Sequence, residues 1–202
     1  MNNEFINSGK SDHVIVNGLC LFWKSWLSNW TTSPMLIDSV RYTCVEQYMM
    51  SMKARRFGDY ITLKNIMGTS SPKEQKDYGR MVQNFNEPLW YDVALEVVTR
   101  ATVEKYRQNP QLLIKLQCLG DVEFVEASPI DKVWGIGLGT DNPDAADKNK
   151  WLGQNLLGQA ITKAKMLIEE LEIAGVSVGG GMDKIWRPDT ADKFMIGLDQ
   201  VG

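Results

Sequence analysis

Histidine and cysteine are scarce in this chain of 202 residues, which contains one histidine and three cysteines. Cys20, Cys44 and Cys118 are scattered, and no two of them have the spacing of a metal or redox motif. With His13 alone in a polar N-terminal stretch, the sequence argues against a Cys/His zinc site and against a Ser-His-Asp or Cys-His catalytic arrangement. We therefore expect acid–base chemistry from carboxylates, lysine or tyrosine, with no metal and no cofactor, in a cytoplasmic protein whose thiols are reduced.

Charge imbalance and long apolar runs are also missing. The chain holds 22 basic and 25 acidic residues, so neither a nucleic-acid coat protein nor a general polyanion binder is expected. A local basic patch remains open at residues 53–56 (KARR), although these residues would equally suit a solvated helix end, where cations stabilise the helix dipole. No run of about 20 apolar residues and no signal peptide is visible, which predicts no membrane partner. The sequence leaves the oligomeric state open.

The length of the chain suits one domain that buries roughly 70% of its unfolded surface. The pattern of apolar residues predicts an α+β fold that is predominantly helical, with a few short strands. We expect the domain to occupy residues 1–174, with an irregular or strand-like lead-in over residues 1–18. A tail over residues 175–202 is expected to follow, with Gly179–Gly181 as a flexible joint.

Turn and capping residues divide the chain into predicted strands and helices. Ser71, Pro72 and Glu74 form a capping box with proline at the first helical position, and Pro110 opens a further helix. Strands are predicted at residues 19–23 and 122–127 and as a hairpin at 35–42, and helices at residues 45–57, 71–85, 88–107, 110–120 and 151–173.

A long loop is predicted over residues 128–149, rich in glycine, aspartate and asparagine. Loops longer than about 15 residues in compact domains are usually functional or disordered, and the apolar content around Trp134 favours a structured, functional loop. Gly135, Gly137 and Gly139 are weak evidence for a phosphate cradle, because the strand–helix context of a dinucleotide-binding motif is missing. Tight turns or close backbone packing explain them equally well.

One face of the predicted helix 45–57 places an acid and an amine among apolar side chains. Glu46, Met50 and Lys53 recur at helical spacing, so they share this face. Two turns, about 10 Å, separate the acid from the amine, which is too far for an easy ion pair and suits the two ends of a small ligand. The structural alternative is a capping box in which Thr43 is the N-cap and Glu46 bonds back to its amide, while Lys53 extends its ammonium into water.

Short motifs in a fixed order carry a resemblance to a known family. They are SNW (28–30), EQYMM (46–50), KA (53–54), FGD (57–59), GR (79–80), Trp90, EASP (126–129), Asp131, WGIG (134–137), WLGQN (151–155) and LG (157–158). In this order the set resembles the NADAR family, also known as the YbiA-like or riboflavin-biosynthesis N-glycosidase family, over about residues 21–171.

The resemblance implies cleavage of N-glycosidic bonds in phosphoribosyl-type substrates. Members of the family are associated with removal of ADP-ribose from guanine bases of nucleic acid, and with hydrolysis of ribosylamino pyrimidine phosphates, which are riboflavin intermediates. We expect the first activity, with ADP-ribosylated DNA or RNA as the partner. The second activity, on a small nucleotide-like substrate, and a non-catalytic ADP-ribose-binding module are the alternatives. A steep salt dependence of binding would favour nucleic acid.

Glycosidic cleavage passes through an oxocarbenium-like state, which a carboxylate stabilises or a nucleophile traps. By resemblance, Lys53 is the candidate covalent nucleophile, and Glu46 and Asp131 are the candidate carboxylates. The candidate substrate-binding residues are Trp90 and Trp134 for the base, Arg80 for a phosphate, Asn29 and Asn155 for sugar hydroxyls, and Gly135 and Gly137 for a phosphate cradle. As structural alternatives, Trp90 would be core and Asp131 would cap a turn.

Overall fold

The computed structural model describes residues 12–175, so the predicted joint at Gly179–Gly181 and most of the predicted tail lie outside the described residues. The strands are β1 (His13–Val16), β2 (Leu19–Phe22), β3 (Met35–Ile37), β4 (Val40–Tyr42) and β5 (Glu123–Glu126). The helices are α1 (Val45–Arg56), α2 (Tyr60–Met67), α3 (Pro72–Arg80), α4 (Glu87–Gln108), α5 (Pro110–Cys118) and α6 (Leu156–Ile173), with the short 3-10 helices η1 (Pro143–Ala146) and η2 (Lys148–Lys150). The expected predominantly helical α+β fold is confirmed.

Two tight hairpins open the described chain. β1 and β2 pair antiparallel across Asn17 and Gly18, and β3 and β4 pair antiparallel across Asp38 and Ser39. All four turn residues have positive φ, as two-residue hairpin loops of type I′ require, and Gly, Asn and Asp adopt this conformation most readily. β2 also pairs in parallel with β5, which gives the larger sheet the order β1-β2-β5.

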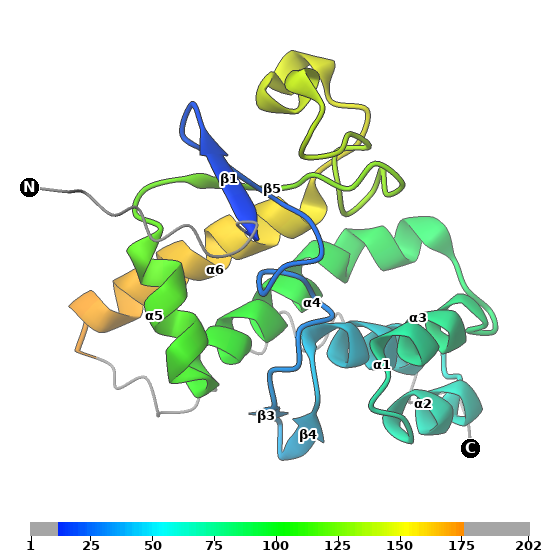
Figure 1. Cartoon of the computed structure of the whole chain (residues 1–202). Coiled ribbons are helices and arrows are strands. Elements are labelled where there is room, and N and C mark those ends of the chain that lie inside the picture. Colours follow the sequence, from blue (N-terminus) through cyan, green and yellow to red (C-terminus); the bar gives the residue numbers. More distant parts are fainter. Residues whose placement is uncertain (1–11, 176–202) are drawn as a thin grey trace, which may run out of the picture.

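Helices pack on one face of this sheet, and residues of the loop between β5 and α6 pack on the other (Figure 1). α4 lies along α6, α6 packs on β5, and α1 packs against α2, α3 and α4. Apolar side chains of these elements form the main core, in which Phe22, Tyr106, Phe124 and Ile161 are fully buried. Removal of apolar surface from water, at roughly 25 cal/mol per Å², is the main force that holds these layers together.

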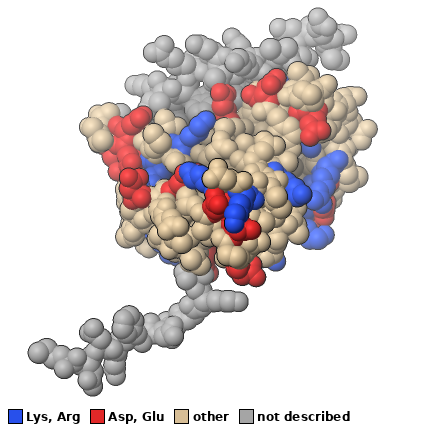
Figure 2. All heavy atoms as spheres, turned by 90° about the horizontal axis from the view of Figure 1, so that it is seen from above, with Lys and Arg blue, Asp and Glu red and all other residues tan. Residues whose placement is uncertain are grey.

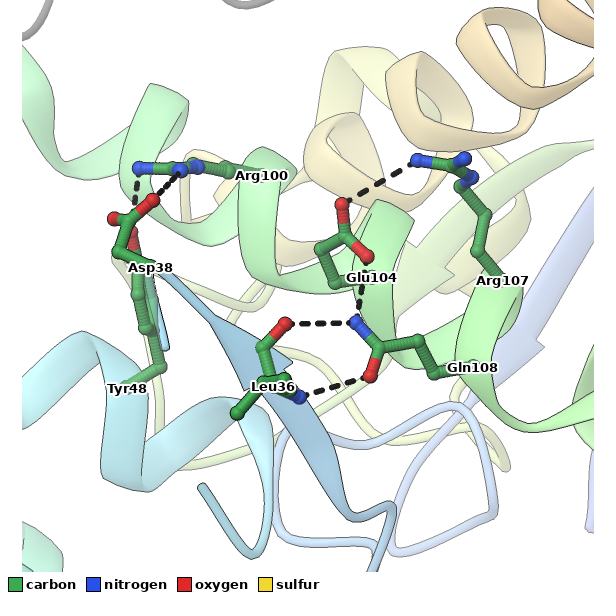
Figure 3. A network of polar contacts seen from close by, with 7 residues as sticks. All are labelled: Leu36, Asp38, Tyr48, Arg100, Glu104, Arg107 and Gln108. Carbon is green, nitrogen blue, oxygen red and sulfur yellow. Dashed lines mark hydrogen bonds and ion pairs between the residues drawn. The ribbon is translucent and has the colours of Figure 1, made fainter. Parts of the chain in front are cut away.

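Polar contacts fasten the β3–β4 hairpin to α4 (Figure 3). The Gln108 side chain donates to the Leu36 carbonyl at 2.9 Å and accepts from the Leu36 N–H at 2.8 Å. Arg100 pairs with Asp38 at 2.6 Å. These contacts satisfy backbone groups at the edge of the hairpin and fix it beside the helix.

The first turn of α1 differs from the predicted capping box. The N-cap is Cys44, and the side chain of Gln47 accepts from the Thr43 N–H at 2.8 Å. Because the helix begins one residue later than the box requires, Gln47 occupies the third helical position. The capping-box interpretation of Thr43 and Glu46 is therefore wrong, and the Glu46 carboxyl is left for another role.

Two other helix ends differ from their predicted positions, and a residue with positive φ lies between each observed end and the predicted one. α6 begins at Leu156, later than predicted, because the preceding Asn155 is left-handed with φ of 56°. α3 ends at Arg80, earlier than predicted, and Asn84 is left-handed in the turn that follows, with φ of 55°. A left-handed residue interrupts the right-handed helical backbone, so neither helix extends through it.

The outside of the protein carries charges of both signs. On the face that Figure 2 shows, acidic and basic side chains are interspersed, as the near-balanced composition suggests. No helix within residues 12–175 is long and apolar enough to cross a membrane. Cys20 and Cys44 are buried free thiols, and Cys118 is an exposed one.

Candidate active site

Two cavities share five lining residues and form one cleft with an inner lobe of about 120 Å³ and an outer lobe of about 400 Å³. The shared residues are Ser28, Trp30, Lys76, Glu126 and Asp131. The inner lobe is completed by Asn29, Glu46, Met49, Met50, Trp134 and Leu157. The outer lobe is completed by Trp23, Lys24, Ser25, Thr31, Ser128 and Ile130. Together the lobes reach the size at which clefts hold small ligands.

The cleft lies where the parallel strands β2 and β5 end. Phe22, the last residue of β2, is in register with Glu126, the last residue of β5. The segments that leave both strands therefore start side by side, at the edge where parallel sheets bind ligands. α1 contributes Glu46 to the cleft, and α3 contributes Lys76.

Glu46 is the most deeply buried acid of the inner lobe, with an exposed fraction of 3%. Its Oε1 has no hydrogen-bond partner among the described residues. Burial raises the pKa of its carboxyl to about 7, against the opposing effects of the Lys76 ammonium and of a side-chain hydrogen bond from Trp30. A carboxyl with such a pKa can hold or release a proton near neutral pH.

Glu126 is a second buried acid, shared by both lobes. Burial raises the pKa of its carboxyl to about 8, and the nearby Asp131 carboxylate adds to the rise. Its Oε2 also has no hydrogen-bond partner among residues 12–175. The Asn155 side chain fixes the strand end, because its Oδ1 accepts from the Glu126 N–H at 2.9 Å and its Nδ2 donates to the Phe124 carbonyl at 3.0 Å.

Lys76 and Asp131 form the charged pair of the cleft. Lys76 Nζ lies 3.9 Å from Asp131 Oδ2 and 5.9 Å from the centre of the Trp30 ring. The other oxygen, Asp131 Oδ1, accepts from the backbone N–H groups of Val133 and Trp134 at 2.9 and 2.8 Å. Asp131 thus caps a turn and also faces the cleft, so the two interpretations of this residue are compatible.

Four of the candidate residues meet in the inner lobe, namely Asn29, Glu46, Asp131 and Trp134. Asn29 is 6% exposed, and its carbonyl accepts from the Glu46 N–H at 3.1 Å. Their roles in binding or catalysis stay predictions. These four residues come from segments that are far apart in the sequence, and the fold brings them together in one lobe.

Lys53 and Arg80 lie outside the lining of either lobe. Lys53 Nζ donates to the Gly79 carbonyl at 2.8 Å and lies 3.9 Å from the centre of the Phe85 ring. Burial and the neighbouring Arg80 guanidinium lower the pKa of Lys53. Arg80 pairs with Asp77 at 3.3 Å on the surface. The nucleophilic role of Lys53 and the phosphate-binding role of Arg80 stay predictions.

The remaining candidates support the site from behind. Trp90 packs in the main core with 4% of its surface exposed. A Cβ on Gly135 would lie 2.9 Å from the carbonyl oxygens of Asp131 and Glu126, so this glycine permits close packing of two backbones. Gly137 has φ of 73°, which favours glycine. Direct substrate contact by these residues and by the bridging Asn155 stays a prediction.

Lys76 and Glu126 are the cleft residues that the sequence did not single out for catalysis. Glu126 ends a predicted strand and opens the EASP motif, so its position beside the loop was the available signal. Lys76 precedes the candidate residue Arg80 by one helical turn, so the sequence placed both on one side of the same helix. Only Lys76 lines the cleft. No group of three or more His, Cys, Asp or Glu side chains in the described part of the chain is arranged to hold a metal ion.

Comparison with known proteins agrees with this geometry. A family model described as the NADAR domain matches residues 20–169, which is most of the chain. The chain belongs to the NADAR family. The match contains every residue that lines the two lobes, so the cleft of this NADAR domain is part of the family region.

Relatives of this NADAR domain occur in distant organisms. The N-glycosidase R617 of Acanthamoeba polyphaga mimivirus is 43% identical over 128 residues, which are 63% of this chain and 75% of that protein. Protein irg-1 of Caenorhabditis elegans is 34% identical over 128 residues, which are 62% of this chain and 60% of that protein. The solved structure of the E. coli protein YbiA has a TM-score of 0.64 at 21% identity and covers 81% of this chain and 92% of that chain, so the YbiA-like fold is confirmed.

Proposed function

We propose that this NADAR domain is an N-glycosidase that cleaves the bond between a sugar C1 and a base nitrogen. The observation that carries the proposal is the buried carboxyl of Glu46, a residue that lines the inner lobe with Lys76 and Asp131 and whose Oε1 has no hydrogen-bond partner among the described residues. The name of the similar mimivirus protein supports the same reaction class. A buried acid without a partner destabilises a fold, so its position in a cleft favours a functional explanation.

Cleavage of an N-glycosidic bond leaves positive charge at C1 and an electron pair on the departing nitrogen. Glu46, with a pKa of about 7, is suited to give that nitrogen a proton as the bond breaks. Asp131 carries the carboxylate that would stabilise the positive sugar. Glu126, with a pKa of about 8, would remain protonated at neutral pH and donate a hydrogen bond to the substrate.

We assign the covalent amine to Lys76, because it lines both lobes while Lys53 lines neither. In its neutral form the amine would attack C1 as the base departs with the proton from Glu46. The Glu46 carboxylate would take a proton from the attached nitrogen and give it to the ring oxygen as the bond from C1 to that oxygen breaks, which leaves a protonated imine at C1. Water would then hydrolyse the imine, releasing the sugar and restoring the amine.

The outer lobe supports a nucleotide-like substrate, and we propose ADP-ribosylated guanine. Trp23 and Trp30 line this lobe with indole rings, and Lys24 lines it with an ammonium group. Aromatic faces stack on bases at roughly 1–3 kcal/mol each, and cations attract phosphates. The inner lobe, at about 120 Å³, would hold the ribose ring that carries the scissile bond.

The test incubates the protein separately with DNA carrying ADP-ribosylated guanine and with a ribosylamino pyrimidine phosphate, each with and without borohydride. We expect release of ADP-ribose from the DNA and a borohydride-trapped adduct at Lys76. Lys76→Ala should lower the rate about 100-fold or more, while Lys53→Ala should retain the adduct. An adduct at Lys53 would reverse the assignment of the amine.

The same assay separates the alternatives. Release of ribose phosphate from the pyrimidine alone would identify the metabolic substrate instead. No release from either substrate, together with tight binding of ADP-ribose, would contradict the enzyme and favour a binding module. Binding to modified DNA is also measured at salt concentrations from about 50 to about 200 mM. A steep fall in affinity over this range would independently support nucleic acid as the partner.

A further inference from the structure

The segment from Ser25 to Thr31 forms a wall of both lobes, yet it belongs to no helix or strand. Its backbone is held by Lys105, which projects from α4. Lys105 Nζ donates to the carbonyl oxygens of Trp26 at 2.9 Å, Leu27 at 3.2 Å and Ser28 at 3.0 Å. Three consecutive carbonyls of the cleft wall therefore converge on one side chain.

The ammonium of Lys105 matches this arrangement closely. Lys105 is 1% exposed, and none of the ion pairs among residues 12–175 includes it. A buried ammonium is unfavourable unless its donors are satisfied, and its three N–H groups face three acceptors. The centre of the Tyr106 ring lies 5.3 Å from Nζ. The backbone carbonyls thus compensate part of the cost of burying this charge, and burial still lowers the pKa of Lys105 to about 7.

The held segment is also bonded to the proposed acid. The carbonyl of Asn29, the residue after the three carbonyls, accepts from the Glu46 N–H at 3.1 Å. Trp30, the next residue, lines the inner lobe together with Glu46. A continuous path of hydrogen bonds and backbone therefore runs from Lys105 through this segment to the backbone of Glu46.

We propose that Lys105 is a positioning residue for the cleft: its ammonium holds the Ser25–Thr31 segment so that the Asn29 carbonyl fixes Glu46. The effect on turnover rests on the proposed N-glycosidase function, whereas the effect on the segment does not. Lys105 is not among the residues that line either lobe, so it acts through the segment and not on the substrate.

Apolar packing allows the fold to survive without the ammonium. The Leu27 side chain is 1% exposed in the main core, and Trp26 meets Tyr106 edge to face with centroids 6.3 Å apart. These side chains anchor the segment independently of the carbonyls. Loss of the ammonium is therefore expected to loosen the backbone at residues 26–29 more than it unfolds the protein.

The experiment compares Lys105→Met with the control Arg107→Met. Arg107 lies one position beyond Tyr106 on the same helix, is 6% exposed and pairs with Glu104 at 3.4 Å (Figure 3). It lines neither lobe of the cleft. Amide hydrogen exchange is measured at Glu46, and kcat and KM are measured on the substrate that the wild type cleaves. Both variants remove a buried cation from α4, so they control for a general loss of stability.

We expect Lys105→Met to speed exchange at the Glu46 amide at least tenfold and to lower kcat at least tenfold with little change in KM. Arg107→Met should leave both unchanged below its unfolding temperature. Unchanged exchange in Lys105→Met would overturn the proposal. If Lys105→Met does not fold, Lys105→Gln, with two donors, replaces it under the same criteria. If the wild type cleaves no substrate, the proposed function fails, and the exchange measurement still decides the role of Lys105.

Discussion

The carboxyl groups of Glu46 and Glu126 each present to the cleft one oxygen that has no partner among the described residues. Such an oxygen typically costs about 1–3 kcal/mol when it is buried. The sequence could place Glu46 on a helix face near a ligand, because helical spacing fixes the face. The sequence could not show which other segments pack beside that face. Glu126 of β5 and Lys76 of α3, which line the same lobe, were therefore not grouped with Glu46.

At the residue scale, Glu46→Gln should abolish turnover and yet stabilise the protein at alkaline pH. The folded pKa of about 7 lies above the ordinary value of 4.5, so the favourable contribution of the protonated acid is complete below 4.5 and is lost as the pH rises through 7. Above pH 7 the wild type bears a penalty on the order of 3 kcal/mol, which glutamine removes. Urea unfolding at pH 5 and pH 8 measures the difference, which should be larger at pH 8. Equal stability of the wild type and Glu46→Gln at both pH 5 and pH 8 would contradict the raised pKa of Glu46.

The raised pKa values of the two glutamates also predict a pH profile. If the reaction needs a protonated acid, kcat/KM should fall as the pH rises through about 7 to 8, because both carboxyls lose their protons there. Glu126→Gln should keep a decline near 7 from Glu46. A rate that increases through this range would mean that loss of a proton, from a carboxyl or from the Lys76 amine, limits the reaction.

At the element scale, capping residues predicted some helix ends and left others unresolved. The Ser71 side chain accepts from the Glu74 N–H, and Pro72 is the first residue of α3, as the capping pattern predicted. The return bond of the box is not formed, because the Ser71 N–H donates to Thr69 Oγ1 and not to Glu74. α2 was missed, although Asp59 caps it by accepting from the Thr62 N–H at 3.0 Å. A helix of eight residues with few buried side chains has a weak apolar period, so packing against α1 and α3 stabilises it more than its own sequence does.

Asn155 links α6 to β5, and Asn155→Ala is expected to lower the free energy of unfolding by about 3 kcal/mol. Alanine would leave the Glu126 N–H and the Phe124 carbonyl without their partners and would strain a backbone with φ of 56°. Asn155→Gly relieves the backbone strain and loses only the hydrogen bonds, so it should be less destabilised than alanine. Urea titration gives both values. Wild-type stability of Asn155→Ala would rule out this linking role.

At the scale of the whole molecule, the cleft draws on both halves of the family region. Its lining extends from Trp23 to Leu157, and the family match ends at residue 169. The ordered motifs allowed this region to be predicted from the sequence. The side-by-side position of the segments could not be, since it depends on the parallel pairing of β2 with β5, which leaves no local signal in the sequence.

A chain shortened to end at Gly175 is expected to retain its fold and its turnover, because every residue that lines the cleft precedes it. The predicted change in kcat/KM is less than about twofold, within what a surface change usually produces. Thermal unfolding and the substrate assay test this on the shortened and full chains side by side. A loss of activity with an unchanged melting temperature would assign the removed residues to the site or to an interface.

The parallel pairing of β2 with β5 also determines when the sheet can form during synthesis of the chain. The strands meet only after the ribosome has made the stretch from Phe22 to Glu126, which at ordinary translation speeds takes on the order of ten seconds. Contacts between distant parts of a chain form late and slow its folding. During that interval β2 has only β1 as a neighbour and leaves its other edge unpaired, so this strand is the part that a chaperone would be expected to shield.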